Sequence, residues 1–102
     1  MLTPDLPVIS LGKLRYGKTY SFIYTLRNNT QSVVKIKSIV VGCTSCTSAT
    51  TNKSTVNPEE STHIEVFFTP GSIGIQNKKI SVFFEDESNP LQLTFTGVVS
   101  DE

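Results

Sequence analysis

The sequence predicts an all-β fold, an antiparallel sandwich of two sheets built from about seven strands in a single domain. Three observations predict it. Apolar and polar residues alternate with a period of two along most of the 102 residues, β-branched and aromatic residues dominate these runs, and turn-forming residues separate them. No segment shows the apolar spacing of an amphipathic helix. A chain of this length forms one core, which we expect over residues 7–99 of a domain spanning 1–102.

Seven runs carry the pattern, and we expect strands over residues 7–11, 18–28, 33–41, 46–50, 61–69, 76–85 and 91–99. The second run places four large side chains on one face, namely Tyr20, Phe22, Tyr24 and Leu26. In the third run Ile36 and Ile39 lie three residues apart, which predicts a β-bulge. The fourth run comes from a Ser/Thr-rich stretch and is the least regular.

The three C-terminal runs alternate most clearly. Their core-facing sets are Ile64, Val66 and Phe68; Ile80, Val82 and Phe84; and Leu91, Leu93, Phe95, Gly97 and Val99. The connecting segments RYGK, RNNTQS, VNPEE, TPGSIG and EDESNP carry Gly, Pro, Asn or Ser where strands should stop. Strands of this length at intervals of about 10 to 15 residues favour an antiparallel sandwich.

The charge balance excludes several classes of partner. Nine Lys and Arg residues balance nine Asp and Glu residues, so no positive excess attracts nucleic acid or an anionic membrane. No apolar run approaches the roughly 20 residues that span a bilayer. The N-terminal segment MLTPDLPVIS lacks the basic and apolar regions of a secretory signal. We therefore expect no nucleic acid, no membrane insertion, and a place in the cytoplasm of the producing cell or in an assembly made there.

Two cysteines, Cys43 and Cys46, are the only ones in the chain and lie in the stretch VVGCTSCTSA. A zinc or copper site needs three or four ligands, but the one histidine lies on another predicted strand and no acid occurs between residues 6 and 58. A redox dithiol normally precedes a helix, and none follows here. A disulfide would close a very small loop and constrain little of the unfolded chain.

The interpretation favoured for Cys43 and Cys46 is a pair of small, half-buried side chains at the bend where the chain crosses between sheets. Cytosolic thiols are normally kept reduced, which agrees with this interpretation. A disulfide, a metal site and a thiol-based redox site remain the alternatives.

Other polar residues do not form a catalytic pattern. His63 alternates with Ile64, so it points outward from its strand, and no nucleophile is paired with it. The acidic pairs and triplets fall in predicted turns without the spacing of a calcium loop. No P-loop, dinucleotide-binding motif or nucleophile elbow occurs. The sequence predicts a protein that is not an enzyme and uses no cofactor.

Three apolar side chains, Ile23, Phe67 and Phe83, lie on strand faces opposite the core sets. Outward apolar side chains of this size are either covered by neighbouring long side chains or form a contact surface. We therefore take all three as candidates for a protein interface.

Charge is unevenly distributed along the chain. Residues 1–53 hold seven basic side chains and one acid, Asp5, whereas the remainder holds two lysines and eight acids. In a sandwich the first turn and the last hairpin should lie at opposite ends, which makes the domain bipolar. Such a domain suits head-to-tail or docking contacts steered by charge, although solvation alone also explains the distribution. The charged interface candidates are Lys13, Arg15, Glu85, Asp86 and Glu87.

The order of short motifs resembles a family of immunoglobulin-like domains of unknown function from bacteria and phages. Its pattern has a Leu-Gly step, a strand ending in Asn, a Cys-Gly-Cys-Thr signature, a Pro-Gly turn, a Gly-containing hairpin and a last strand ending in Gly-Val. The matching positions here are Leu11-Gly12, Asn28, Cys46-Thr47, Pro58, Gly74, Asn89-Pro90 and Gly97-Val98. Two positions depart from it: the cysteine signature is one residue longer, and Glu59 replaces the glycine after Pro58.

The resemblance implies an immunoglobulin-like antiparallel β-sandwich related to the ASH domains of abnormal-spindle and hydin proteins and to the PapD and major-sperm-protein group. It also implies a domain that binds or builds, without enzyme activity. The function expected from it is a structural module of a phage virion, such as a capsid decoration or stabilising protein, with capsid proteins or copies of itself as partners. The alternatives are a bacterial adaptor that binds partner proteins, and a metal- or thiol-handling protein that uses Cys43 and Cys46.

Overall fold

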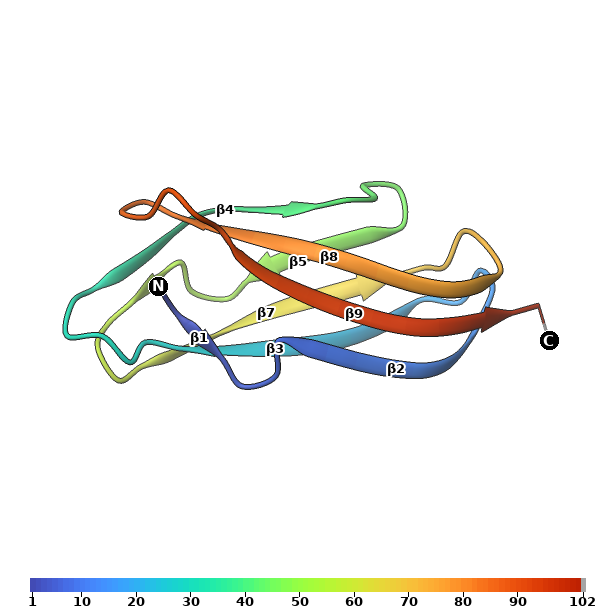
Figure 1. Cartoon of the computed structure of the whole chain (residues 1–102), viewed down its shortest axis with the longest axis horizontal. Helices are drawn as coiled ribbons and strands as arrows, with labels where there is room; N and C mark the ends of the chain where they lie inside the picture. Colours follow the sequence, from blue (N-terminus) through green and yellow to red (C-terminus); the bar gives the residue numbers. More distant parts are fainter. Residues whose placement is uncertain (102) are drawn as a thin grey trace.

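The computed structural model describes residues 1–101, which form two β-sheets packed face to face (Figure 1). The four-stranded sheet has the order β1 (Thr3–Pro4), β3 (Tyr20–Arg27), β7 (Ser61–Phe68) and β5 (Thr47–Thr51). The five-stranded sheet has the order β2 (Val8–Arg15), β9 (Leu91–Ser100), β8 (Gly74–Phe84), β4 (Val34–Val41) and β6 (Thr55–Val56). The sandwich is elongated, 48 Å by 20 Å by 19 Å, and its two termini lie at opposite ends.

The predicted all-β sandwich is confirmed, and each of the seven expected strands is present. Two further strands, β1 and β6, have only two residues each, too few to show a period. The expected strand at 7–11 extends to Arg15, because Gly12 takes a φ of +73° at a shift of register between Ser10 and Lys13. Glycine adopts this left-handed conformation without the steric cost that a Cβ would impose.

One part of the prediction is wrong: the sandwich is not entirely antiparallel, since β2 pairs with β9 in parallel. The chain leaves β2 and enters β3 in the other sheet, so β2 does not pair with the next strand along the chain. Its neighbour is instead the last strand, which runs in the same direction. A parallel neighbour requires a long connection, and nearly the whole chain lies between these two strands.

The core lies between the sheets, where the expected core-facing sets of β3, β7, β8 and β9 meet. Phe95 packs edge to face against Phe22 and Phe68, with ring centroids 4.9 Å and 5.0 Å apart. The Tyr24 hydroxyl crosses the core and donates a hydrogen bond of 2.5 Å to the carbonyl oxygen of Thr94. Desolvation of the buried hydroxyl raises the pKa of Tyr24 above its ordinary value.

The predicted bulge in β4 is also confirmed. The pairing of β4 with β8 shifts between Ile36 and Ser38. As a result Ile36 lies opposite Phe84 and Ile39 lies opposite Val82, so both isoleucines face the core although they are three residues apart. An inserted residue of this kind is the usual cause of such spacing.

The loops and turns lie at the two ends of the sandwich and are joined there by backbone hydrogen bonds. The N-terminal end holds the N-terminus and the loops 28–33, 57–60 and 85–90, and the C-terminal end holds the turns 16–19, 42–46 and 69–73 and the last strand residues. At the C-terminal end the backbone N–H of Tyr16 donates to Ser100 and that of Thr69 donates to Cys46, both at 2.8 Å. At the N-terminal end the backbone N–H of Glu85 donates to Lys35 at 3.0 Å.

Asn28 fixes the N-terminal end. It is fully buried, and its side-chain NH₂ donates to the carbonyl oxygens of Ser32 and Val56, each at 2.9 Å. Its side-chain oxygen accepts from the backbone N–H of Thr30 at 2.9 Å and from the Thr30 hydroxyl at 2.6 Å. One side chain therefore holds together the 28–33 loop and the strand β6.

Glu59 stands where a glycine was expected after Pro58. It takes a φ of +67°, in the left-handed region that favours glycine.

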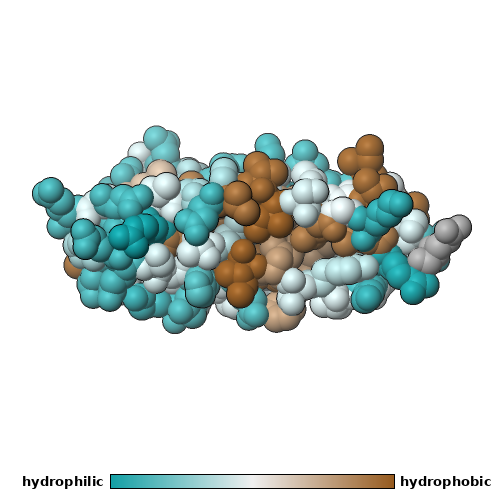
Figure 2. All heavy atoms as spheres, turned by 90° about the horizontal axis from the view of Figure 1, so that it is seen from below, coloured by the Kyte–Doolittle hydropathy of each residue, from teal (hydrophilic) through white to brown (hydrophobic). Residues whose placement is uncertain are grey.

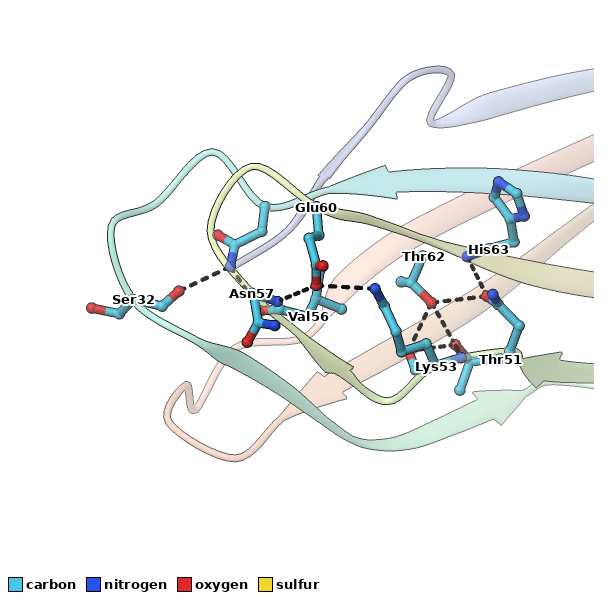
Figure 3. A network of polar contacts seen from close by, with 10 residues as sticks. Ser32, Thr51, Lys53, Val56, Asn57, Glu60, Thr62 and His63 are labelled. Carbon is cyan, nitrogen blue, oxygen red and sulfur yellow. Dashed lines mark hydrogen bonds and ion pairs between the residues drawn. The ribbon is translucent and has the colours of Figure 1, made fainter.

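The neighbouring carboxylate, Glu60, accepts from Lys53 Nζ at 3.0 Å and from the backbone N–H of Asn57 at 3.1 Å (Figure 3). The hydrogen bond from Lys53 is the main cause that lowers the pKa of Glu60.

Candidate functional site

The apolar interface candidates fall on two different faces. Ile23 and Phe67 lie on the outer face of the four-stranded sheet, 50% and 42% exposed. They are diagonal neighbours, because Ser21 pairs with Phe67 and Ile23 pairs with Glu65. Phe83 lies on the outer face of the five-stranded sheet, and it is only partly exposed. The three side chains therefore form no common surface.

A larger apolar feature lies elsewhere, on the outer face of β8 and β9 toward the C-terminal end. Ile75 and Val98 pair directly across these strands and are 84% and 52% exposed. Val98 also pairs with Lys13 of β2, so the three side chains form one row across three strands. The next pair along these strands on the same face is Asn77 with Thr96. Beyond that pair, Lys79, Thr94 and Val8 form another row across the same three strands.

We call this surface the apolar-basic face and define it by Val8, Lys13, Arg15, Ile75, Lys79 and Val98. Figure 2 views the molecule from the side of β2 and shows two gatherings of hydrophobic atoms, one near the middle and one toward the C-terminal end. Ile75 and Val98 were not among the residues expected at an interface. Their signal was present, since each has the opposite parity to the core set of its own strand.

The strands of the five-stranded sheet contain six basic side chains and no acid, namely Lys13, Arg15, Lys35, Lys37, Lys78 and Lys79. Among residues 1–101 only two ion pairs form, between the Met1 amino group and Glu87 and between Lys53 and Glu60. The basic groups of the apolar-basic face therefore have no acidic partner within the described chain. Their charge is directed to solvent at this face.

Five acidic side chains lie at the opposite, N-terminal end. They are exposed and belong to the loops 57–60 and 85–90, as Glu59, Glu60, Glu85, Asp86 and Glu87. We call this surface the acidic end. Lys13 and Arg15 lie far from it, because Arg15 pairs with Ser100 beside the first turn. The structure thus places the two groups of charged interface candidates at opposite ends of a sandwich 48 Å long.

Cys43 and Cys46 form a disulfide, which corrects the favoured interpretation of two separate half-buried side chains. The expected bend is present, since the loop 42–46 carries the chain from β4 in one sheet to β5 in the other. Within it the backbone N–H of Thr47 donates to the carbonyl oxygen of Cys43 at 3.0 Å. This single turn brings the two Cα atoms to 5.6 Å, a separation that a disulfide spans.

Among residues 1–101, no group of three or more His, Cys, Asp or Glu side chains is arranged to hold a metal ion. Within the same range, no helix is long and apolar enough to cross a membrane.

Solved structures show the same fold in several settings. A protein of unknown function from Porphyromonas gingivalis W83 matches with a TM-score of 0.82 at 14% identity, over 96% of this chain and 46% of that one. The ASH/PapD-like domain 7 of human CEP192 matches with 0.69 at 12% identity, over 99% and 86%. SSP-19, an MSP-domain-like protein of Caenorhabditis elegans, matches with 0.70 at 16% identity, over 95% and 99%.

These likenesses show that the fold is the immunoglobulin-like sandwich of the ASH, PapD-like and MSP domains. The chain spans less than half the length of the Porphyromonas protein. No curated protein sequence matches it. A family model matches residues 2–99, nearly the whole chain. The chain therefore belongs to the family described as "Protein of unknown function (DUF1573)".

Proposed function

We propose that this domain is a non-enzymatic structural module that joins proteins into a larger assembly, in which the acidic end of one copy docks on the apolar-basic face of the next. The observation that carries the proposal is the row formed by Ile75, Val98 and Lys13. An isoleucine that is 84% exposed, directly beside an exposed valine, leaves apolar area in water that a partner surface would cover.

Charge complementarity selects the occupant. The face presents Lys13, Arg15 and Lys79 without acidic partners. The acidic end of the same chain presents five carboxylates, of which Glu60 and Glu87 each pair with one basic group of the chain. Opposite charges on two surfaces of one molecule steer copies into a head-to-tail encounter. Such a contact joins two different surfaces, so it repeats from copy to copy and builds a row or ring rather than a closed pair.

The dimensions of the molecule set the strength of this contact. The short dimensions of 20 Å and 19 Å limit an end-on contact to about 400 Å² per copy, half of the roughly 800 Å² per partner in a standard interface. We therefore expect a weak contact, with a dissociation constant of about 0.1 to 1 mM. A contact of this strength holds only where many copies lie side by side or where a second partner tethers them.

Sedimentation velocity of the purified protein tests the proposal. At protein concentrations up to about 1 mM and at low salt, the wild-type sedimentation coefficient should rise with concentration. Salt should suppress the rise, because the Debye length falls from about 30 Å at 0.01 M to about 3 Å at 1 M. Ile75→Ser, and Lys13→Gln combined with Lys79→Gln, should also suppress it.

The matched control is Lys35→Gln combined with Lys37→Gln, which removes two exposed lysines of the same sheet outside the apolar-basic face. This control should associate like the wild type. A wild-type protein that stays monomeric at about 1 mM would overturn the proposal, and so would equal effects of the two double variants.

Two biological settings suit such a module. The first is a phage virion, where the domain would decorate or stabilise a capsid, and the second is a bacterial adaptor that binds partner proteins. Both rest on the family resemblance, and the adaptor setting agrees with the occurrence of the fold as a part of longer proteins. Identification of the proteins bound to it in its native source separates them, since capsid or tail proteins support the first setting only.

The second candidate function, metal or thiol handling, is favoured by one observation, the joined sulfurs of Cys43 and Cys46. Mass spectrometry under native conditions, with and without a chelator, tests the metal part. A mass that is unchanged by the chelator would rule out a bound metal.

A further inference from the structure

The loop 42–46 is the one place among residues 1–101 where two side chains of redox chemistry meet, and the hollow beside it shares only Lys79 with the apolar-basic face. From its surroundings we infer that Cys43 and Cys46 form a thiol–disulfide exchange site, in which Cys43 is the reactive sulfur and a dithiol is the co-reactant. Three features carry the inference: the small contribution of the bridge to the fold, the unlike surroundings of the two sulfurs, and the two hollows beside them.

The bridge contributes little to the fold. Only two residues separate the cysteines, so the bridge closes a very short loop and removes little conformational entropy from the unfolded chain. The same turn is already closed by the hydrogen bond from Thr47 to Cys43 and is attached to the neighbouring strand connection by that from Thr69 to Cys46. The loop can therefore keep its shape when the bridge is open.

Cys43 has surroundings that favour a thiolate. The Ser45 hydroxyl oxygen lies 3.6 Å from the Cys43 sulfur, within the reach of a hydrogen bond to sulfur. A hollow of about 330 Å³ borders Cys43 and is also lined by Lys78 and Lys79 of β8. A hydroxyl donor and basic side chains that line the same hollow favour negative charge on a sulfur there.

Cys46 has surroundings that favour the protonated thiol. Its side chain packs against the hydrophobic core, and its sulfur lies 3.8 Å from the carbonyl oxygen of Cys43 and 3.5 Å from the Thr47 hydroxyl. Each sulfur therefore has a hydroxyl nearby, and the core packing and the lack of basic neighbours distinguish Cys46 from Cys43. A carbonyl oxygen accepts a hydrogen bond from a thiol and repels a thiolate. The smaller hollow beside Cys46, of about 150 Å³, is lined by Phe67, Thr69 and the loop itself and brings no basic group.

The reaction proceeds in two balanced steps. A thiolate of the dithiol attacks the Cys43 sulfur, forming a mixed disulfide and breaking the bond to Cys46, whose sulfur leaves with the electron pair and takes a proton. The second thiol of the reductant, deprotonated, attacks its own partner sulfur in the mixed disulfide, and Cys43 leaves as a thiolate. The dithiol is oxidised to a disulfide, and the cysteine pair is reduced by two electrons.

Labelling of the reduced protein tests the assignment. The full chain is reduced with dithiothreitol, freed of reductant and reacted with iodoacetamide at pH 7, and the label on each cysteine is followed by mass spectrometry. We expect Cys43 to react at least about fivefold faster than Cys46, since an ordinary thiol is only a few per cent ionised at this pH. Lys78→Gln combined with Lys79→Gln should slow Cys43 several-fold and leave Cys46 unchanged.

The matched control is Lys13→Gln combined with Arg15→Gln, which removes two charges of the same sheet outside this hollow and should leave both rates unchanged. A second measurement uses oxidised dithiothreitol or glutathione with single-cysteine variants. Cys46→Ser should form a mixed disulfide with glutathione at Cys43 several-fold faster than Cys43→Ser forms one at Cys46. Equal rates at the two cysteines, or a bridge that excess dithiothreitol leaves closed in the folded protein, would overturn the inference.

Discussion

Replacement of Asn28 by alanine tests how the acidic end is built. The side chain is fully buried and makes four hydrogen bonds, two donated to the carbonyl oxygens of Ser32 and Val56 and two accepted from Thr30. A net loss of about 1 kcal/mol per bond gives an upper figure of about 4 kcal/mol. Water can reach part of this loop in the variant, so we expect a loss of about 3 kcal/mol in the free energy of unfolding.

Urea unfolding followed by circular dichroism measures the Asn28→Ala change, and a loss of this size should lower the thermal midpoint by roughly 15 °C. Asn28→Asp should be at least as damaging, because it keeps the acceptor oxygen and turns a second oxygen toward two carbonyls. The control is Asn29→Ala, an exposed neighbour, which should change stability by less than about 0.5 kcal/mol. If Asn28→Ala were as stable as this control, the hydrogen bonds would not be what holds this end together.

Two further predictions concern stability. Burial raises the pKa of Tyr24, so its contribution to stability is fully present below the unfolded-state pKa of about 10 and is lost as pH rises above that value, by about 1 kcal/mol at pH 11. Tyr24→Phe should be about 1 kcal/mol less stable at pH 7 but should lose less stability between pH 7 and pH 11. Urea midpoints at the two pH values measure both losses, and an equal loss in the two proteins would contradict this reasoning. Glu59→Gly should stabilise the protein by about 0.5 to 1 kcal/mol, because glycine removes the cost of a φ of +67°; a lower urea midpoint in this variant would contradict the strain at Glu59.

The regular strands could be predicted because the sheets bury one face each. The sets at Ile64, Val66 and Phe68 and at Ile80, Val82 and Phe84 alternate strictly, and every member is buried. The spacing of Ile36 and Ile39 even predicted the bulge. What the period cannot reveal is the neighbour of a strand, because a register is fixed by contacts between distant segments. The parallel pairing of β2 with β9 therefore required the structure.

The candidate site was predicted only in part. The placement of Lys13 and Glu85 at opposite ends could be predicted, because the order of the strands along the chain decides which turns lie at the same end of a sandwich. The pairing of Ile75 with Val98 was missed because Ile75 lies just before the expected strand 76–85, whereas β8 begins at Gly74, and only the register of β8 and β9 makes the two residues one patch. Whether Cys43 is joined to Cys46 depends on the geometry of a single turn, and the spacing of the two cysteines does not determine that geometry.

The account of assembly is tested most directly by mixing two variants that each keep one of the two surfaces. The first carries Ile75→Ser, Lys13→Gln and Lys79→Gln and keeps the acidic end. The second carries Glu85→Gln, Asp86→Asn and Glu87→Gln and keeps the apolar-basic face. Head-to-tail docking predicts that each variant alone sediments as a monomer at about 1 mM, while an equimolar mixture forms a complex that stops at two chains. A mixture that stays monomeric under conditions where the wild type associates, or a single variant that associates as strongly as the wild type, would contradict it.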